Sequence, residues 1–184
     1  MIHPRCRLFI SNHTEKIMNN PISTGIKAID KLTDGLHPSV IIVIGFRSVV
    51  GKTTFLQFLI KNICEELKIP SLFFNMESAR EKSFVQMNRE LPDSPLPNAS
   101  LPFFSDDTPF LSINALCERA KALGKFCGVK IVFIDMLGLV SVEMDAKPVY
   151  EQMSEKMQKL KYFAREFDVP VVVTTQIASI DGRF

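Results

Sequence analysis

A short stretch of the chain has the residue types and spacing of a phosphate-binding loop. The tetrapeptide Gly51–Thr54 follows the apolar run Val40–Ile44, which is typical of a short buried strand, and precedes apolar residues at helical spacing. A strand, a loop and a helix in this order place backbone N–H groups and a helix N-terminus around a bound anion. Lysine can reach the β- and γ-phosphates, and the threonine after it can ligate Mg²⁺. We therefore predict a nucleotide site, the alternative being an ordinary turn that happens to contain this tetrapeptide.

The loop departs from the usual phosphate-loop pattern at one position. The pattern G-x-x-x-x-G-K-[ST] would place its first glycine at Phe46, whereas the sequence has a glycine one residue earlier, at Gly45. The residues after this position are those that we expect to surround the phosphates: Arg47, Ser48, Val49, Val50, Gly51, Lys52, Thr53 and Thr54.

Polar residues also stand at the ends of three other predicted strands. Glu77 follows the strand expected at residues 71–76, Asp135 follows the apolar run 129–134, and Gln176 ends the strand expected at 171–176. Ligands of an open α/β sheet bind beyond the carboxyl ends of its strands, so we expect these residues and the loop to lie together.

Each of these residue types suits one task in phosphate chemistry. Asp135 fits a carboxylate that holds Mg²⁺ together with Thr53. Glu77 fits a general base for the attacking water, and Gln176 fits a hydrogen-bond partner of the γ-phosphate or of that water. Each also has a plainer interpretation. Asp135 would cap a turn or helix, Glu77 would face a helix dipole, and Gln176 would be an ordinary strand-end amide.

Strands and helices alternate along the sequence. Ser23 or Thr24 is the expected cap of a first helix that Asp34 and Gly35 close. This alternation predicts an α/β fold, in which a mainly parallel sheet carries helices on both faces. Helices are expected at residues 26–33, 55–63, 79–90, 113–126 and 149–167, and strands at 40–44, 71–76, 103–104, 129–134 and 171–176.

Length and composition further limit the classes of function that the chain can have. A chain of 184 residues is enough for one domain with a substantial core, and its hydrophobic share of 46% and charged share of 23% are ordinary for a soluble globular protein. A net charge of +2 does not indicate nucleic-acid binding. The apolar runs are too short for a membrane span or a signal peptide, and the four cysteines lack metal-ligand spacing. We therefore expect a cytoplasmic protein with reduced thiols.

From about Ser23 to Ile177, the sequence resembles the C-terminal RecA-like ATPase domain of DnaB-type replicative DNA helicases. Four blocks in order carry the resemblance: TGIKAIDKLTDGLHPS with the strand after it, FRSVVGKTTF, LFFNMES, and IVFIDMLGLV followed by LKYFAREFDVPVVVTTQI. The resemblance implies a RecA-like P-loop NTPase core that binds and hydrolyses ATP with Mg²⁺ in DNA replication and unwinding. It places the family's catalytic glutamate at Glu77, its Walker B aspartate at Asp135 and its strand-end glutamine at Gln176.

The same family commonly has alanine at the position of Phe46, followed by arginine as at Arg47, so a missing first glycine is expected there. Other positions depart from the family: Phe46 is bulkier than alanine, Ser48–Val49 replaces Pro-Ser, Met136 and Gly138 replace Tyr and Gln, and Ala178–Ser179 replaces a polar-basic pair. The chain ends at Phe184, before the family's DNA-contacting loops and arginine finger. We expect residues 1–20 to be a tail or linker remnant and residues 21–184 to form an ATP-binding domain without the C-terminal part of the family domain.

The resemblance also bears on partners and on activity. It implies a homo-oligomer, which is a hexamer in the family, or binding to a full-length helicase, whereas loops for DNA are not found and no membrane partner is expected. Hydrolysis is expected to be slow in the isolated domain, because an arginine finger from a neighbour is worth ~10³–10⁵ in rate in related NTPases. A non-catalytic nucleotide-binding regulator or partner of a replicative helicase is the alternative. A recombinase of the RecA type is a third interpretation, against which the block LFFNMES argues.

Overall fold

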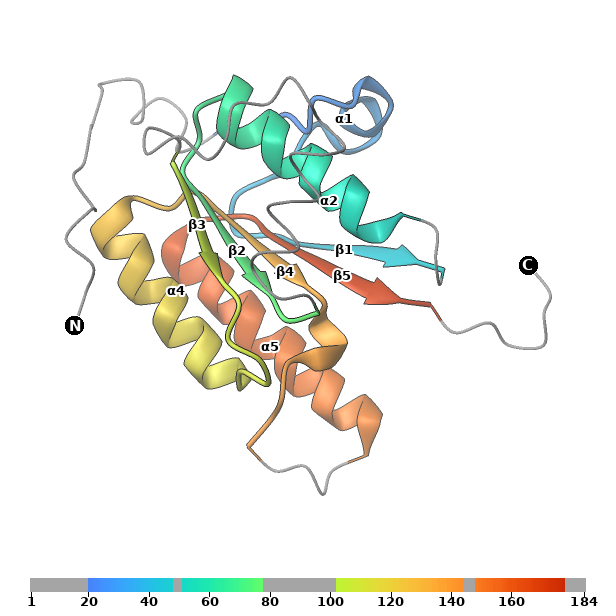
Figure 1. Ribbon diagram of the computed structural model, residues 1–184, viewed down its shortest axis with the longest axis vertical. Coiled ribbons are helices and arrows are strands. Elements are labelled where there is room, and N and C mark those ends of the chain that lie inside the picture. Colours follow the sequence, from blue (N-terminus) through green and yellow to red (C-terminus); the bar gives the residue numbers. More distant parts are fainter. Residues whose placement is uncertain (1–19, 48–50, 78–101, 144–147, 178–184) are drawn as a thin grey trace.

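In the part of the chain that the structure describes, five parallel strands form one sheet. The structure is a computed structural model that describes residues 20–47, 51–77, 102–143 and 148–177. Within these residues the strand order is β1-β5-β4-β2-β3, and every neighbouring pair is parallel (Figure 1). The strands are β1 (Ile41–Phe46), β2 (Ser71–Asn75), β3 (Phe103–Asp106), β4 (Ile131–Asp135) and β5 (Val171–Gln176).

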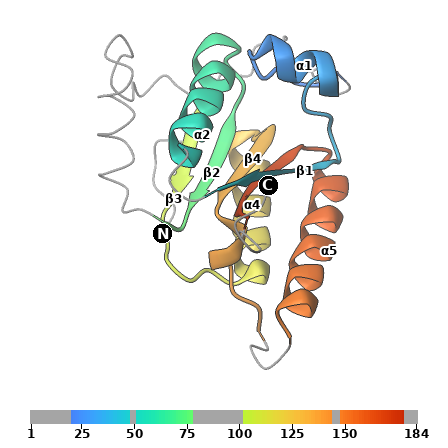
Figure 2. The same ribbon diagram turned by 90° about the vertical axis from the view of Figure 1, so that its right-hand side faces the viewer.

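Helices cover both faces of this sheet. Figure 2 shows α2 on one side and α5 on the other, with α4 beside α5 in Figure 1. The predicted α/β class and mainly parallel sheet are therefore confirmed, whereas the helix expected at 79–90 lies outside the described residues. The helices are α1 (Lys27–Thr33), α2 (Lys52–Lys61), which continues as a π-helical turn (Asn62–Glu66), α4 (Ile113–Cys127), a 3₁₀ turn (Leu137–Leu139) and α5 (Val149–Phe167).

Residues of the central strands alternate between two cores, one on each face of the sheet. On β4, Val132 and Ile134 belong to the core under α4 and α5, whereas Ile131 and Phe133 belong to the core under α2. The alternation follows from the two-residue period of a strand. All five positions of β4 are buried, which explains why its sequence is a continuous apolar run.

The strand β1 differs from the sequence prediction in its burial. The apolar run predicts a buried strand, but β1 lies at the edge of the described sheet, and none of its six residues is fully buried. Val43 is 51% exposed. An apolar run indicates that a strand can be buried on both faces, but it does not specify how many strands flank it. The prediction of a buried strand is therefore wrong for β1 within the described residues.

The start of α1 also differs from the prediction. Ile26 occupies the N-cap position and makes no side-chain cap bond. The Ser23 and Thr24 hydroxyls instead donate to the carboxylate of Asp30, at 2.6 and 2.7 Å. The charged acceptor attracts both hydroxyls away from the helix amides, since hydrogen bonds to a charged group are the stronger ones. The predicted helix end is confirmed, because Asp34 has a left-handed backbone and stands at the C-cap position.

Two buried cysteines agree with the expectation of reduced thiols. Cys64 and Cys117 are free and buried, and burial raises the pKa of each thiol to about 11. Among the helices that the structure describes, none has the length and apolar character that a membrane span requires.

A polar cluster around Asp106 fixes the edge strand β3 to α4. Arg119 Nη1 donates to Asp106 Oδ2 and to the Thr108 hydroxyl, each at 2.7 Å, and Thr108 donates to Asp106 Oδ1 through its N–H and its hydroxyl. Burial of the carboxyl group opposes its charge. The hydrogen bonds from Thr108 and Arg119 outweigh burial and lower the pKa of Asp106 below its ordinary value.

Asp106→Asn is therefore expected to lower the free energy of unfolding by about 1 kcal/mol near neutral pH, a modest value because the Arg119 side chain is 45% exposed. The pKa is lower in the folded chain, so the carboxylate contributes fully above its unfolded pKa of about 3.9 and this contribution is lost as the pH falls through the folded value. Urea unfolding at a series of pH values should show that the variant loses less stability in acid. Glu118→Gln, an exposed change on the same helix, is the control, and the same acid loss in both variants would contradict the assignment.

Candidate nucleotide-binding site

The carboxyl ends of the parallel strands place the predicted site residues on one rim of the sheet. Lys52 begins α2, directly after the loop that follows β1. Asp135 ends β4 and is paired in register with Asn75, two residues before Glu77. Gln176 ends β5 and is paired in register with Phe46. Residues from four separate parts of the sequence therefore share this rim, because parallel strands all end on the same side.

Lys52 lies between the two predicted carboxylates and contacts both. Its Nζ donates to Glu77 Oε2 and to Asp135 Oδ1, the second at 2.5 Å. The side chain of Asp135 is 1% exposed and that of Lys52 14%, whereas that of Glu77 is 44% exposed. One ammonium group therefore joins a buried carboxylate to one that faces solvent.

The charge on Lys52 is favoured by these partners. Burial is the largest single influence and by itself would lower the pKa of the ammonium group. The hydrogen bonds and charges of Asp135 and Glu77 together outweigh burial and raise the pKa of Lys52 above its ordinary value. The site therefore carries a permanent cation at neutral pH.

The first turn of α2 supplies backbone donors next to this cation. The first intrahelical bond at this end runs from the Phe55 N–H to the Gly51 carbonyl, so the amides of Lys52, Thr53 and Thr54 precede it. Gly51 has a φ of 86°, in the left-handed region, and a Cβ added there would meet no atom within 4 Å. Glycine is thus required at this position by backbone conformation rather than by space.

Phe46, at the position of the missing first glycine, packs against this same turn. Its ring centroid lies 5.6 Å from that of Phe55, with the two planes tilted by 55°. The bulky side chain is therefore accommodated between β1 and α2.

A triphosphate with Mg²⁺ fits this set of donors. Amide N–H groups at a helix N-terminus and a lysine ammonium group bind phosphate oxygens, and a hydroxyl with a carboxylate suits Mg²⁺, which prefers oxygen ligands. Within residues 20–47, 51–77, 102–143 and 148–177, no three His, Cys, Asp or Glu side chains group together as a metal site. Such a cation would therefore take few ligands from the protein and the rest from phosphates and water, as is usual for Mg²⁺.

The other predicted residues lie around these three central side chains. Thr53 is half-buried, and Arg47, Thr54 and Gln176 are exposed. Ser48, Val49 and Val50 lie outside the described residues. The structure thus brings Lys52, Glu77 and Asp135 into contact and places the remaining described residues on the same rim.

One residue that contacts this site was missed in the sequence. The Thr174 hydroxyl, on β5, donates to Asp135 Oδ1 at 2.6 Å and is fully buried. The sequence feature that could have indicated this residue was a threonine that interrupts the apolar run of a buried strand. It could not be interpreted without the register that places it beside Asp135.

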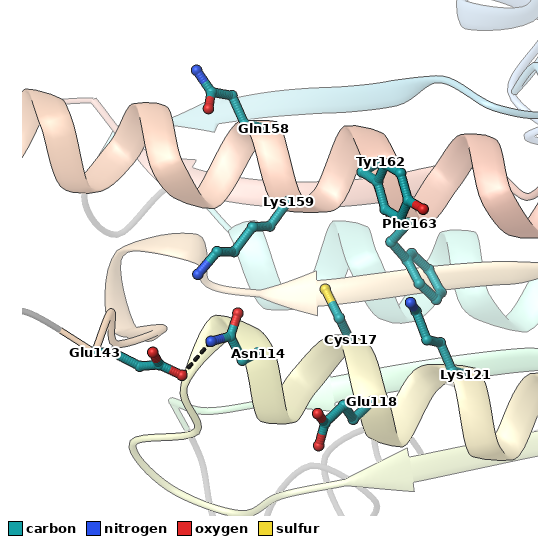
Figure 3. A pocket seen from close by; sticks show the side chains of 9 residues that line it. All are labelled: Asn114, Cys117, Glu118, Lys121, Glu143, Gln158, Lys159, Tyr162 and Phe163. Atoms are coloured by element: carbon teal, nitrogen blue, oxygen red, sulfur yellow. Dashed lines mark hydrogen bonds between the residues drawn. The ribbon is translucent and has the colours of Figure 1, made fainter.

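A cleft of about 430 Å³ lies elsewhere, between α4 and α5 on the other face of the sheet from α2 (Figure 3). It contains none of the predicted site residues, and its lysines and glutamates balance in charge. Lys121, one of these lysines, is already paired with Glu166 at 2.7 Å. We therefore assign the site to the rim. The cleft is lined by Asn114, Cys117, Glu118, Lys121, Glu143, Gln158, Lys159, Tyr162 and Phe163.

Comparison with known proteins identifies the family of this chain. The model of the family "DnaB-like helicase C terminal domain" matches residues 21–92 and 93–180. The "Probable replicative DNA helicase" of Trieres chinensis is 31% identical in an alignment 190 residues long, which covers 88% of this chain and 41% of that protein. The chain spans about two fifths of the length of the curated relatives it matches.

Solved structures agree at the level of the fold. A DnaB-like replicative helicase, whose structure was described with its interactions with primase, is similar with a TM-score of 0.72 at 20% identity, over 89% of this chain and 45% of that one. The RadB recombinase is similar with a TM-score of 0.61 at 21% identity, over 88% of this chain and 72% of that one. The RecA-like fold expected from the sequence is therefore confirmed. Because the family model matches most of its residues, the chain belongs to the DnaB-like helicase C-terminal domain family.

Proposed function

We propose that this chain binds ATP with Mg²⁺ and hydrolyses it slowly, as the ATPase domain of a protein for DNA replication and unwinding. The observation that carries the proposal is the contact of Lys52 with both Glu77 and Asp135. Phosphoryl transfer to water requires three groups. They are a lysine after a phosphate-loop glycine, a carboxylate at the end of one strand, and a second carboxylate just beyond the end of the neighbouring strand. Membership of the DnaB-like family supports the same reaction.

Each residue of the rim has a separate task in this proposal. Lys52 turns from its carboxylates toward the β- and γ-phosphates, and Gly51 allows the backbone amides to approach them. Thr53 and Asp135 hold Mg²⁺, which when bound neutralises phosphate charge. Glu77 has an exposed carboxylate and accepts a proton from the attacking water.

The remaining predicted residues surround the phosphates. Gln176 hydrogen-bonds the γ-phosphate from the end of β5, and Arg47, Ser48, Val49, Val50 and Thr54 complete the loop. Family membership further supports assembly into a homo-oligomer, a hexamer in the family, or binding to a full-length helicase, and work in the cytoplasm on replicating DNA. Residues 21–184 form the ATP-binding domain in this proposal, and residues 1–20 a tail or linker.

Calorimetry and phosphate release on the same preparation test the proposal. We expect ATP to bind only weakly without Mg²⁺ and well with it, and phosphate to be released slowly. Single-stranded DNA and a full-length helicase of the family are added in separate experiments. Absence of ATP binding at millimolar nucleotide would overturn the proposal. Tight binding without phosphate release under any condition would favour the regulator, for which the bulky Phe46 beside α2 is the supporting observation.

A further inference from the structure

The buried carboxylate of Asp135 has a second protein donor besides Lys52. The Thr174 hydroxyl lies 2.6 Å from Asp135 Oδ1, and neither side chain has appreciable contact with solvent. We infer that Thr174 is a positioning residue that fixes the Asp135 carboxylate in the orientation needed to hold the metal ion of the nucleotide. This inference rests on the proposed function, because it assigns a role to Thr174 within that same site.

The register of the sheet makes this contact direct. β4 and β5 are paired from Val132 with Val171 to Ile134 with Val173, and Asp135 and Thr174 are the next residues on each strand. Neighbouring strands lie about 4.8 Å apart, so side chains at adjacent positions on one face meet without an intervening water. Thr174 therefore approaches the carboxylate from within the rigid sheet rather than from a loop.

The hydroxyl has one proton and two acceptors within reach. The Ile134 carbonyl oxygen is 3.3 Å away, whereas the Asp135 carboxylate oxygen is 2.6 Å away. A short bond to a charged acceptor is stronger than a long bond to a neutral one, so the proton goes to the carboxylate. The bond then fixes the rotation of the carboxyl group.

Thr174 and Lys52 differ in how permanent their bonds to Asp135 are. Lys52 has a long, rotatable side chain, and the proposed function requires it to turn toward the phosphates. Thr174 is fully buried in the sheet, so its short side chain cannot turn toward the phosphates. Both donors bind Oδ1, so Thr174 keeps this oxygen occupied after Lys52 has turned, and Oδ2 keeps its orientation and stays available to the metal ion.

Metal binding separates this role from a merely structural one. Thr174→Val keeps the shape of the side chain and removes the donor, whereas Thr174→Ser keeps the donor. Ser71→Ala is the matched control, because it removes a buried hydroxyl bonded to the Ile69 carbonyl at the start of β2, away from the rim. Electron paramagnetic resonance measures Mn²⁺ binding in the presence of ADP, calorimetry measures ADP binding without metal, and thermal unfolding verifies that each variant folds.

We expect Thr174→Val to raise the dissociation constant for Mn²⁺ about 10- to 100-fold, the range for residues that orient metal ligands, with metal-free ADP binding unchanged. The dissociation constants for Mn²⁺ of Thr174→Ser and Ser71→Ala should stay within about threefold of the wild-type value, which is a small change compared with that range. If the valine variant does not fold, Thr174→Cys replaces it, because the thiol is a weaker donor than the hydroxyl. This variant should show an intermediate loss of Mn²⁺ affinity.

Wild-type Mn²⁺ affinity in Thr174→Val, or an equal loss in Ser71→Ala, would overturn this inference alone. Failure of the wild-type chain to bind nucleotide at all would overturn the proposed function and this inference with it.

Discussion

Replacing Lys52 by alanine is expected to lower ATP turnover strongly and to destabilise the protein at the same time. The proposed site loses the cation that binds phosphate, and removal of one preorganised charge of this kind lowers turnover by a factor on the order of 10²–10³. The same change leaves the carboxylate of Asp135, 1% exposed, without its ammonium partner. Breaking a buried pair in this way costs about 3 kcal/mol, toward the low end of the usual range because Lys52 keeps some exposure. Phosphate release and urea unfolding measure the two effects.

Loss of stability must not be mistaken for loss of chemistry in this variant. The double variant Lys52→Ala with Asp135→Asn removes both charges, so it should recover most of the stability and none of the turnover. Lys61→Ala, at the far end of α2, is the matched lysine control, since its ion pair with Glu65 spans 3.9 Å near the surface and contributes at most about 1 kcal/mol. ATP turnover at the wild-type rate in Lys52→Ala would refute the assignment of the site.

Replacing Glu77 by glutamine is expected to separate binding from hydrolysis. Glutamine cannot accept the proton of the attacking water, and loss of a general base lowers turnover by about 10²- to 10⁴-fold. ATP binding should be retained or strengthened, because Lys52 then has one carboxylate fewer competing with the phosphates. The stability should change little, since the Glu77 side chain is 44% exposed and the buried bond from Lys52 to Asp135 remains.

Calorimetry and single-turnover phosphate release on the same protein measure this separation. Glu66→Gln, which makes the same chemical change at the exposed end of the π-helical turn after α2, is the control. A Glu77→Gln protein that hydrolyses ATP at the wild-type rate would show that another group activates the water. Loss of ATP binding would instead show that Glu77 is needed to shape the site.

The sequence predicted the helices and strands well because their period and their ends are encoded locally. Helix α4 is followed by Gly128 at its C-cap position, where a φ of 63° suits glycine, and α5 begins directly after Pro148. The convergence of Lys52, Glu77 and Asp135 was also predictable, since each follows a strand and parallel strands end on one side. These predictions needed only chain order and a rule of topology.

Burial and register could not be predicted in the same way. Val149 has the spacing of a core position on α5 but is 78% exposed, and Val43 is half exposed on β1. Apolar side chains show where burial would be favourable, but the neighbours that cover them come from other parts of the chain. Thr174 faces Asp135 only because β5 pairs with β4 in one register, which a single sequence does not specify.

The triad of Lys52, Glu77 and Asp135 has an electrostatic consequence for the form of nucleotide that can enter. One ammonium and two carboxylate groups sum to a formal charge of −1, so this cluster is slightly anionic despite its lysine. A bare polyphosphate would meet repulsion from both acids at short range, where interactions are weakly screened. A polyphosphate that arrives already complexed with a divalent ion brings the positive charge that these acids attract, so we expect the proposed site to favour the complex before any chemistry begins.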